Sequence, residues 1–169
     1  MTRRRLPWQS AGLTASAVLA VSLGVAGCGA GAVRPRFVPF PQALVDTVPG
    51  DPEAVVERLT ALLAGEGISV RWSKAVEGYV ETRWFDAATK RERGANSLDT
   101  EAVVRLRFWA DPDYLGGTVV VGEAVHRRVL DPSLPIRETE APVSEDHPAA
   151  EILRRVMDAL VSGEDNRAG

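Results

Sequence analysis

Alternation of apolar and polar residues constrains the fold of this chain more than any other feature of its sequence. In residues 104–109, three apolar side chains alternate with Arg105, Arg107 and Trp109. A period of two is typical of a β-strand that buries one face, and such strands usually pair antiparallel. The same period recurs at residues 68–72 and 80–84, where further strands are predicted. Residues 44–48 are predicted to be a short strand, and the long β-branched run of residues 118–129 another.

Two segments with a helical period flank these strands. The first, residues 52–65, follows the capping residue Asp51 and starts with Pro52, and the second runs from Pro148 to a stop at Gly163. Each amphipathic helix needs an apolar surface, which one face of an antiparallel sheet provides. We therefore predict a single α+β domain over residues 44–162. It is a two-layer sandwich in the order strand, helix, four strands, helix, with both helices on one face of the sheet.

The remaining segments of the domain are predicted to be turns and solvated loops. Residues 87–99 and 131–146 carry many charges or prolines and no core pattern. Asp111 and Asp113 lie among turn residues, and Gly122 suggests a β-bulge. Residues 163–169 are expected to be a disordered tail.

Residues 1–27 have the composition of a targeting segment. Arg3, Arg4 and Arg5 precede a run of small and apolar residues that is too short and too diluted to span a membrane. The run ends in Val25-Ala26-Gly27-Cys28, which contains the only cysteine of the chain. This combination resembles the signal peptide and lipobox of bacterial lipoproteins. The alternative is an ordinary signal peptide or anchor helix in which Cys28 is incidental.

The lipoprotein resemblance implies a membrane anchor at Cys28. Diacylglycerol would be attached to its sulfur, and cleavage would follow Gly27. Two or three acyl chains hold a protein on a bilayer without a spanning helix. Gly29, rather than Asp, follows the cysteine, which by the same resemblance favours the periplasmic face of the outer membrane over the inner membrane in a diderm host. The protein is thus expected to be exported and lipid-anchored.

Residues 28–43 are predicted to form a flexible tether between this anchor and the domain. Pro35, Pro39 and Pro41 favour extended chain and remove backbone donors. The segment also contains Phe37 and Phe40. The alternative to a mobile spacer is therefore a segment that docks these two rings on the domain.

A second resemblance concerns residues 44–110. A short strand, a helix and the strand Gly78-Tyr-Val-Glu-Thr-Arg-Trp84 are similar to the helix-grip domain of BamC-like lipoproteins, which belong to an envelope-assembly machinery. The resemblance implies a helix-grip fold and an envelope protein as partner. The chain differs from that family in having one such domain instead of two, and in lacking a long clamping segment, so the partner is not named by the resemblance.

The face of the sheet turned away from the helices is the candidate binding surface. Alternation places one set of side chains toward the core: Val80, Thr82, Trp84, Val104, Leu106 and Phe108. It places the other set outward: Tyr79, Glu81, Arg83, Phe85, Arg105, Arg107 and Trp109. Arginine interleaved with aromatic residues is typical of interface hot spots, which nominates Tyr79, Arg83, Arg105, Arg107 and Trp109 as partner-binding residues. The alternative is a solvated face held by cross-strand pairs of Glu81 with Arg105 or Arg107.

The sequence offers no catalytic, metal or cofactor motif. His126 and His147 are predicted to lie on a strand and at a helix cap, outside any metal-binding spacing. A net charge of −3 argues against nucleic acid as a partner. We therefore expect a non-enzymatic interaction or envelope-assembly module without cofactors. The alternative is a carrier of a small apolar ligand, with Trp72, Trp84 and Phe108 lining its pocket.

Overall fold

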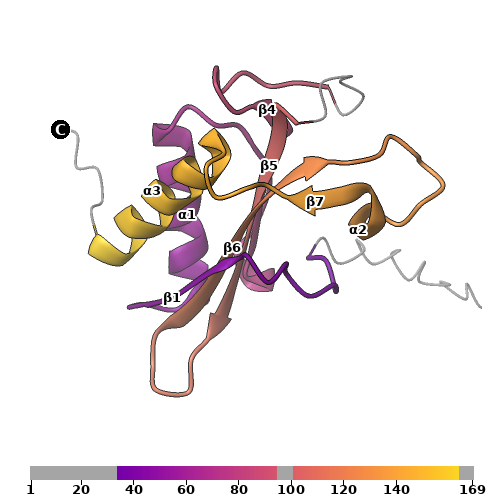
Figure 1. The fold of residues 1–169 in the computed structure, drawn as a ribbon. Coiled ribbons are helices and arrows are strands. Elements are labelled where there is room, and N and C mark those ends of the chain that lie inside the picture. The colour runs from indigo at the N-terminus through magenta and orange to yellow at the C-terminus, as the bar shows by residue number, and fades with distance from the viewer. Residues whose placement is uncertain (1–33, 95–100, 164–169) are drawn as a thin grey trace, which may run out of the picture. The chain divides into compact units, whose positions relative to one another are not determined.

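The computed structural model describes residues 34–94 and 101–163 (Figure 1). The predicted signal peptide, Cys28 and the tail after Gly163 lie outside these residues. The elements, in chain order, are β1 Leu44–Val48, α1 Pro52–Gly65, β2 Val70–Lys74, the 3-10 helix η1 Ala75–Glu77, β3 Tyr79–Thr82, β4 Phe85–Asp86, β5 Val103–Pro112, β6 Thr118–Arg127, α2 Ile136–Thr139, β7 Glu140–Pro142 and α3 Pro148–Ser162.

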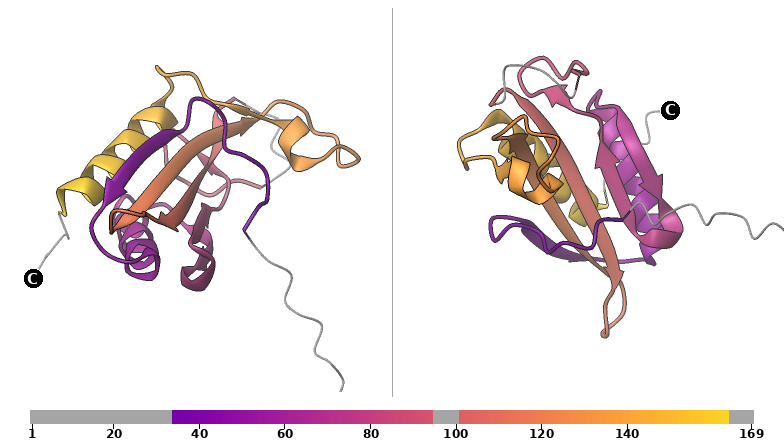
Figure 2. Two further views of the ribbon diagram at one scale, coloured as in Figure 1. Left: turned by 90° about the horizontal axis from the view of Figure 1, so that it is seen from below. Right: turned by 90° about the vertical axis from the view of Figure 1, so that its right-hand side faces the viewer.

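The strands form one antiparallel sheet of seven strands. Its central path is β1-β6-β5-β3-β2, while β4 pairs with β5 and β7 pairs with β6. The long hairpin of β5 and β6 forms the centre of the sheet (Figure 2). Its register runs unbroken from Val104 opposite His126 to Pro112 opposite Thr118. The predicted α+β class and antiparallel sheet are confirmed.

Both main helices pack on one face of this sheet, as predicted (Figure 1). Helix α1 begins where Asp51 Oδ1 accepts a hydrogen bond from the Ala54 amide, 2.9 Å away. Helix α3 begins at Pro148, with His147 Nδ1 accepting from the Ala149 amide, and its C-cap is Gly163 in the left-handed region. These caps supply hydrogen-bond partners for the backbone groups that a helix end leaves unpaired. The start of each helix could therefore be predicted from its capping residue.

The main core fills the space between the helices and the sheet. Val55, Leu59 and Leu63 of α1 and Leu153 and Leu160 of α3 are buried there. The strands contribute the other side of the core through Val80, Phe85, Val104, Leu106, Phe108, Val120 and Ala124. The predicted inward residues of β5 are therefore confirmed.

The inward and outward residues at the end of the β3 segment differ from the prediction. Strand β3 ends at Thr82, residues 83–84 lie outside any strand, and pairing resumes at Phe85 in β4. This two-residue break shifts the alternation by one. Phe85 consequently lies in the helix-side core, whereas Trp84 is buried with Val103 and Val125 on the opposite face. The assignment of Trp84 inward and Phe85 outward is wrong.

Two predicted irregularities are also corrected. Residues 131–146 are not only an exposed loop, because they contain α2 and β7, and β7 extends the sheet beside β6. Gly122 is not a bulge, since the β5–β6 register is continuous through it. A Cβ there would lie 3.0 Å from Leu153 Cδ1 and 3.2 Å from the Phe108 ring, so glycine allows α3 to pack closely on β6. Within the described residues, no helix has the length and apolar character needed to cross a bilayer.

Candidate functional site

The second face of the sheet is buried rather than solvated. Of the five residues predicted to bind a partner, Tyr79, Arg105, Arg107 and Trp109 are buried, and only Arg83 is exposed. Glu81, predicted to pair across this face, is buried as well. The prediction of an exposed face is therefore wrong, and the reason is that other parts of the chain cover it.

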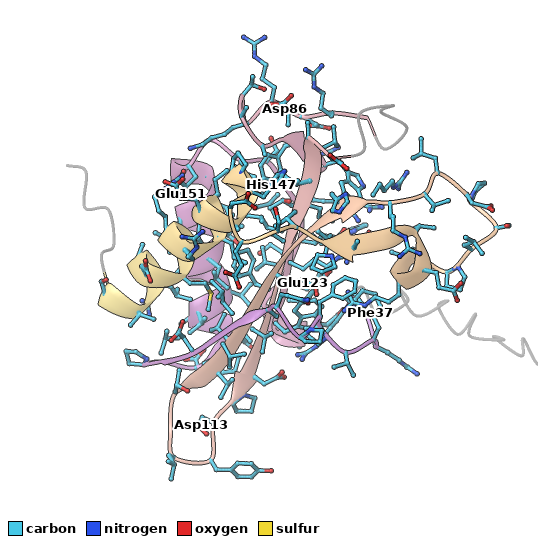
Figure 3. All side chains as sticks on the ribbon, in the orientation of Figure 1. Phe37, Asp86, Asp113, Glu123, His147 and Glu151 are labelled. Carbon is cyan, nitrogen blue, oxygen red and sulfur yellow. The ribbon has the colours of Figure 1, made fainter. Side chains whose placement is uncertain are left out.

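One cover is the segment of residues 34–40, which we call the docked segment. Arg34 is held by the carboxylate and carbonyl of Glu77 and by Asp111. Phe37 is labelled in Figure 3. Its ring contacts Trp109 edge-on, with the two ring centroids 6.3 Å apart. The amide of Phe40 donates to Glu123 Oε2 at 3.0 Å. This part of the predicted tether thus follows the docking alternative.

The other cover comes from α2 and β7, within the segment that the sequence suggested to be a loop. Arg137 of α2 lies over the Phe40 ring, with its guanidinium carbon 3.2 Å from the ring centroid, and donates to the carbonyl of Val38. The first residue of β7, Glu140, turns its carboxylate beneath this layer. Segments from both ends of the chain therefore close the same face of the sheet.

A network of buried charges lies beneath these covers, and Arg107 is its centre. The guanidinium binds both oxygens of Glu140, at 2.7 and 2.8 Å. It also donates to Glu81 at 3.0 Å and to Glu123 at 3.3 Å. Tyr79 adds its hydroxyl to Glu81 at 2.9 Å. Such bidentate, charge-assisted bonds are among the stronger hydrogen bonds in proteins.

The network fixes the charge of its members. Burial by itself lowers the pKa of Arg107, but the hydrogen bonds and charge of Glu140 outweigh this effect and raise that pKa above its ordinary value. Burial, together with the charge of Glu81, raises the pKa of Tyr79 well above its ordinary value. Arg107 therefore stays charged and Tyr79 stays neutral across the physiological range. The carboxylates of Glu81, Glu123 and Glu140 each accept a hydrogen bond from this one guanidinium.

Glu123, Glu140 and Arg137 were not nominated from the sequence as members of this site, and Phe40 was named only in the docking alternative for the tether. Glu123 carried a signal, because it is an isolated carboxylate within the β-branched run of residues 118–129, and a charge inside a buried strand requires a partner. The other three come from segments expected to be mobile or solvated. No local pattern indicates that they meet.

A cavity lined by arginines lies beside this network, around Trp84. Its volume is about 420 Å³. The arginines at its wall are Arg71, Arg83, Arg93, Arg105 and Arg127. Arg105 and Arg127 stack over the Trp84 ring, with guanidinium carbons 4.4 and 5.1 Å from its centroid. We call this feature the arginine pocket.

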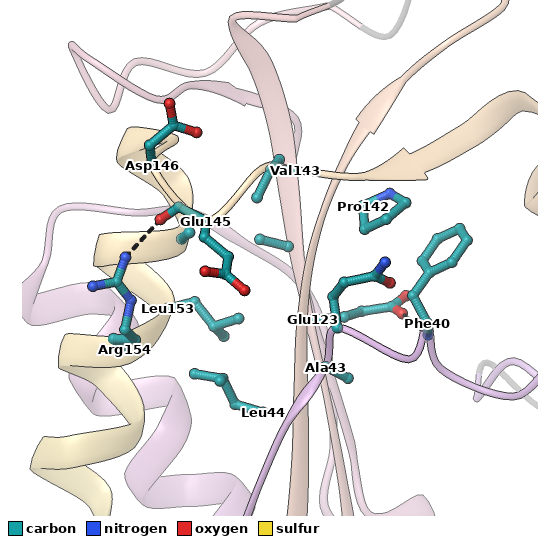
Figure 4. A pocket seen from close by; sticks show the side chains of 13 residues that line it. Phe40, Ala43, Leu44, Glu123, Pro142, Val143, Glu145, Asp146, Leu153 and Arg154 are labelled. Carbon is teal, nitrogen blue, oxygen red and sulfur yellow. Dashed lines mark hydrogen bonds between the residues drawn. The ribbon is translucent and has the colours of Figure 1, made fainter.

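A second cavity, of about 580 Å³, lies between the start of α3 and the chain before β1 (Figure 4). Leu44, Ala124, Val143 and Leu153 line its apolar part. Glu145 and Arg154 lie at one side of the cavity, where an Arg154 nitrogen donates to the Glu145 carbonyl at 2.8 Å. Volumes of several hundred Å³ are typical of small-molecule sites.

The predicted carrier pocket does not form from the residues named for it. Phe108 lies in the helix-side core, Trp84 lies on the other face of the sheet, and Trp72 on the edge strand β2 is 38% exposed. These three side chains consequently share no cavity. The cavity near α3 is built from other residues.

The remaining candidate side chains have local roles. His147 caps α3, as predicted, and Asp111 pairs with Arg34. His126 lies on β6 with its Nδ1 buried and without a hydrogen-bond partner. In the part of the chain that the structure describes, no three His, Cys, Asp or Glu side chains are grouped as a metal site would require.

No protein-family model matches this chain, and no curated protein matches it at a significant level.

Proposed function

We propose that this chain is a lipid-anchored cell-envelope lipoprotein that acts as a non-enzymatic interaction module. The observation that carries the proposal is the position of the only cysteine, Cys28, at the end of Val25-Ala26-Gly27 and behind a basic and then apolar segment. Small residues before the cleavage site suit a narrow protease groove. A thiol is the nucleophile that thioether formation requires.

The buried polar groups support a binding role over a catalytic one. Glu81, Glu123 and Glu140 all receive hydrogen bonds from Arg107. A general base needs access to a proton on a substrate, and these carboxylates are covered by the chain itself. Of the predicted partner-binding residues, Arg83 is the one exposed to a partner, so we place the interaction around Arg83.

Acylation of Cys28 is tested by the variant Cys28→Ser in a bacterial host that processes lipoproteins. We expect the wild type to incorporate labelled palmitate and to accumulate as precursor when the lipoprotein signal peptidase is inhibited with globomycin. The variant should do neither, because no other thiol can take the lipid. Palmitate labelling of Cys28→Ser, or a wild type that ignores globomycin, would contradict the anchor.

A second candidate function is transport of a small apolar ligand, and the 580 Å³ cavity near α3 favours it. Ala124 and Leu153 lie in its wall, so an acyl chain or similar molecule would contact apolar side chains there. Native mass spectrometry of protein purified from the envelope tests this version. A recurrent adduct of one mass supports a carrier, whereas protein free of adducts argues against it.

A further inference from the structure

The arginine pocket contains a buried cation with few partners. The side chain of Arg105 is only 6% exposed, and among the described residues it forms one ion pair, with Glu81 at 3.3 Å. Its Nε has no hydrogen-bond partner. The indole nitrogen of Trp84, against which Arg105 stacks, is also buried without a partner. Native proteins rarely leave such buried donors unpaired, and a bound ion or ligand is one of the usual partners.

The arginines around Arg105 outnumber the carboxylates, although Arg71, Arg83 and Arg93 are each paired with a carboxylate, at 3.3, 3.1 and 3.6 Å. Five arginines line the cavity, and the carboxylates in the same wall are Glu92 and Glu140. Glu140 is already bound through both oxygens to Arg107. Burial lowers the pKa of Arg105 to about 10, so this guanidinium is still charged near neutral pH but is held at a cost that an anion would offset.

The geometry points to a phosphoryl group as the ligand of the arginine pocket. Guanidinium groups recognise phosphate through paired donors, and a phosphomonoester carries close to two negative charges at neutral pH. A volume of about 420 Å³ leaves room for a sugar or glycerol attached to that group. The phosphoryl group belongs to a soluble phosphomonoester or to a lipid headgroup. This site deepens the proposed function by naming its ligand chemistry, and it stands apart from acylation at Cys28.

Fluorescence of Trp84 provides the test, because both Arg105 and Arg127 of the pocket stack on its ring. Purified mature protein is titrated with glycerol 3-phosphate and with inorganic phosphate at low salt, with acetate as the monoanionic comparison. We expect a saturable change for both phosphates that weakens as salt rises. The change should be lost in Trp84→Phe, which identifies the reporting residue. Absence of a saturable change, or equal binding of acetate, would overturn the proposal.

Variants of exposed arginines separate binding from folding. Arg83 lies at the wall of the pocket with a side chain that is 53% exposed, so Arg83→Gln should fold normally. We expect it to weaken phosphate binding by about tenfold, the usual effect of losing one charge-assisted hydrogen bond. Arg154→Gln on α3 is the matched control and should bind as the wild type does. Equal binding by both variants would overturn the site even if phosphate binds somewhere on the protein.

The source of the phosphoryl group is resolved by presenting it on a membrane. The protein is reconstituted in phosphatidylcholine vesicles with and without phosphatidic acid, and Trp84 fluorescence is compared. A response to phosphatidic acid assigns a headgroup, and a response to glycerol 3-phosphate alone assigns a soluble ligand. The acyl mass on Cys28 is measured on the same sample, so that a missing anchor contradicts the proposed lipoprotein while the titrations still decide the pocket.

Discussion

The guanidinium of Arg107 connects most of the buried charged residues on the second face of the sheet. Arg107 is 1% exposed and is bonded to carboxylates from three different strands, β3, β6 and β7. Charges buried at this depth are tolerated only when their partners are well placed. Removing the centre would leave three carboxylates in a poorly solvated environment, which makes the residue far more important than its exposed neighbours of the same type.

We therefore predict that Arg107→Met destabilises the protein by about 3–5 kcal/mol, the range measured when one partner of a buried ion pair is removed. Urea unfolding at neutral pH measures the effect. Arg83→Met is the control, because its exposed pair with Glu92 should contribute at most about 1 kcal/mol. A loss below about 1 kcal/mol for Arg107→Met would mean that the carboxylates find solvent or other partners.

Helices with capping residues and strands with an alternating pattern could be predicted from the sequence. The short strand β4, which follows a break in the strand pairing, could not. The caps at Asp51 and His147 place α1 and α3, and alternation in residues 104–108 orients β5. The break at residues 83–84 has no such signal, because Arg83 and Trp84 continue the alternating pattern of β3 in the sequence. There the Arg83 amide bonds to the Ser69 carbonyl, and the Trp84 carbonyl accepts from Arg93. Those bonds involve other segments of the chain. Tertiary contacts therefore determine which side chains after Thr82 point toward the helices.

The turn from η1 into β3 requires a glycine at position 78. Its φ is +58°, and an added Cβ would lie 2.1 Å from the carbonyl oxygen of Ala110 on β5. The same glycine accepts a hydrogen bond from the Ala110 amide through its own carbonyl at 2.9 Å. A side chain at this position would therefore push β3 away from β5 in addition to straining the backbone.

We predict that Gly78→Ala costs more than about 2 kcal/mol of unfolding free energy. Gly67→Ala is the matched control, since its φ is also positive but nothing lies within 4 Å of the added Cβ. That variant should lose only about 1 kcal/mol, from backbone strain alone. Thermal unfolding of both proteins gives the comparison. Equal losses of unfolding free energy in the two variants would show that β5 shifts to accommodate the added Cβ at position 78.

At the scale of the whole described domain, the sheet is covered on both faces, and the second cover is not apparent from the sequence. The contact between Phe40 and Glu123 joins residues 83 positions apart. The Pro-rich composition of residues 34–43 predicts extended chain, and the segment is indeed outside helices and strands until β1. Composition gives no indication of where an extended segment docks. The candidate face was therefore identified by its residues but given the wrong exposure.

Docking of this segment leads to a prediction about the domain as a unit. The double variant Phe37→Ala and Phe40→Ala should lose about 2 kcal/mol of stability, because two partly buried rings leave Trp109, Arg107 and Arg137. Trypsin should then cut after Arg36 much faster than in the wild type. Val38→Ala, which alters a side chain in the same segment that is 81% exposed, should change neither result. Unchanged proteolysis in the double variant would show that Arg34 and the backbone alone hold the segment.

The docked segment also sets how far the domain can travel from the bilayer under the proposed anchor. Arg34 binds Glu77 and Asp111, so only the chain between Cys28 and Arg34 can separate the domain from the anchor. At about 3.3–3.6 Å per residue, the maximum length of that connection is about 20 Å. A free chain from Cys28 to β1 would have a maximum length more than twice as great. The domain would then stay close to the membrane that holds its anchor. A short connection of this kind gives a high effective concentration for binding other proteins or lipids in the same leaflet.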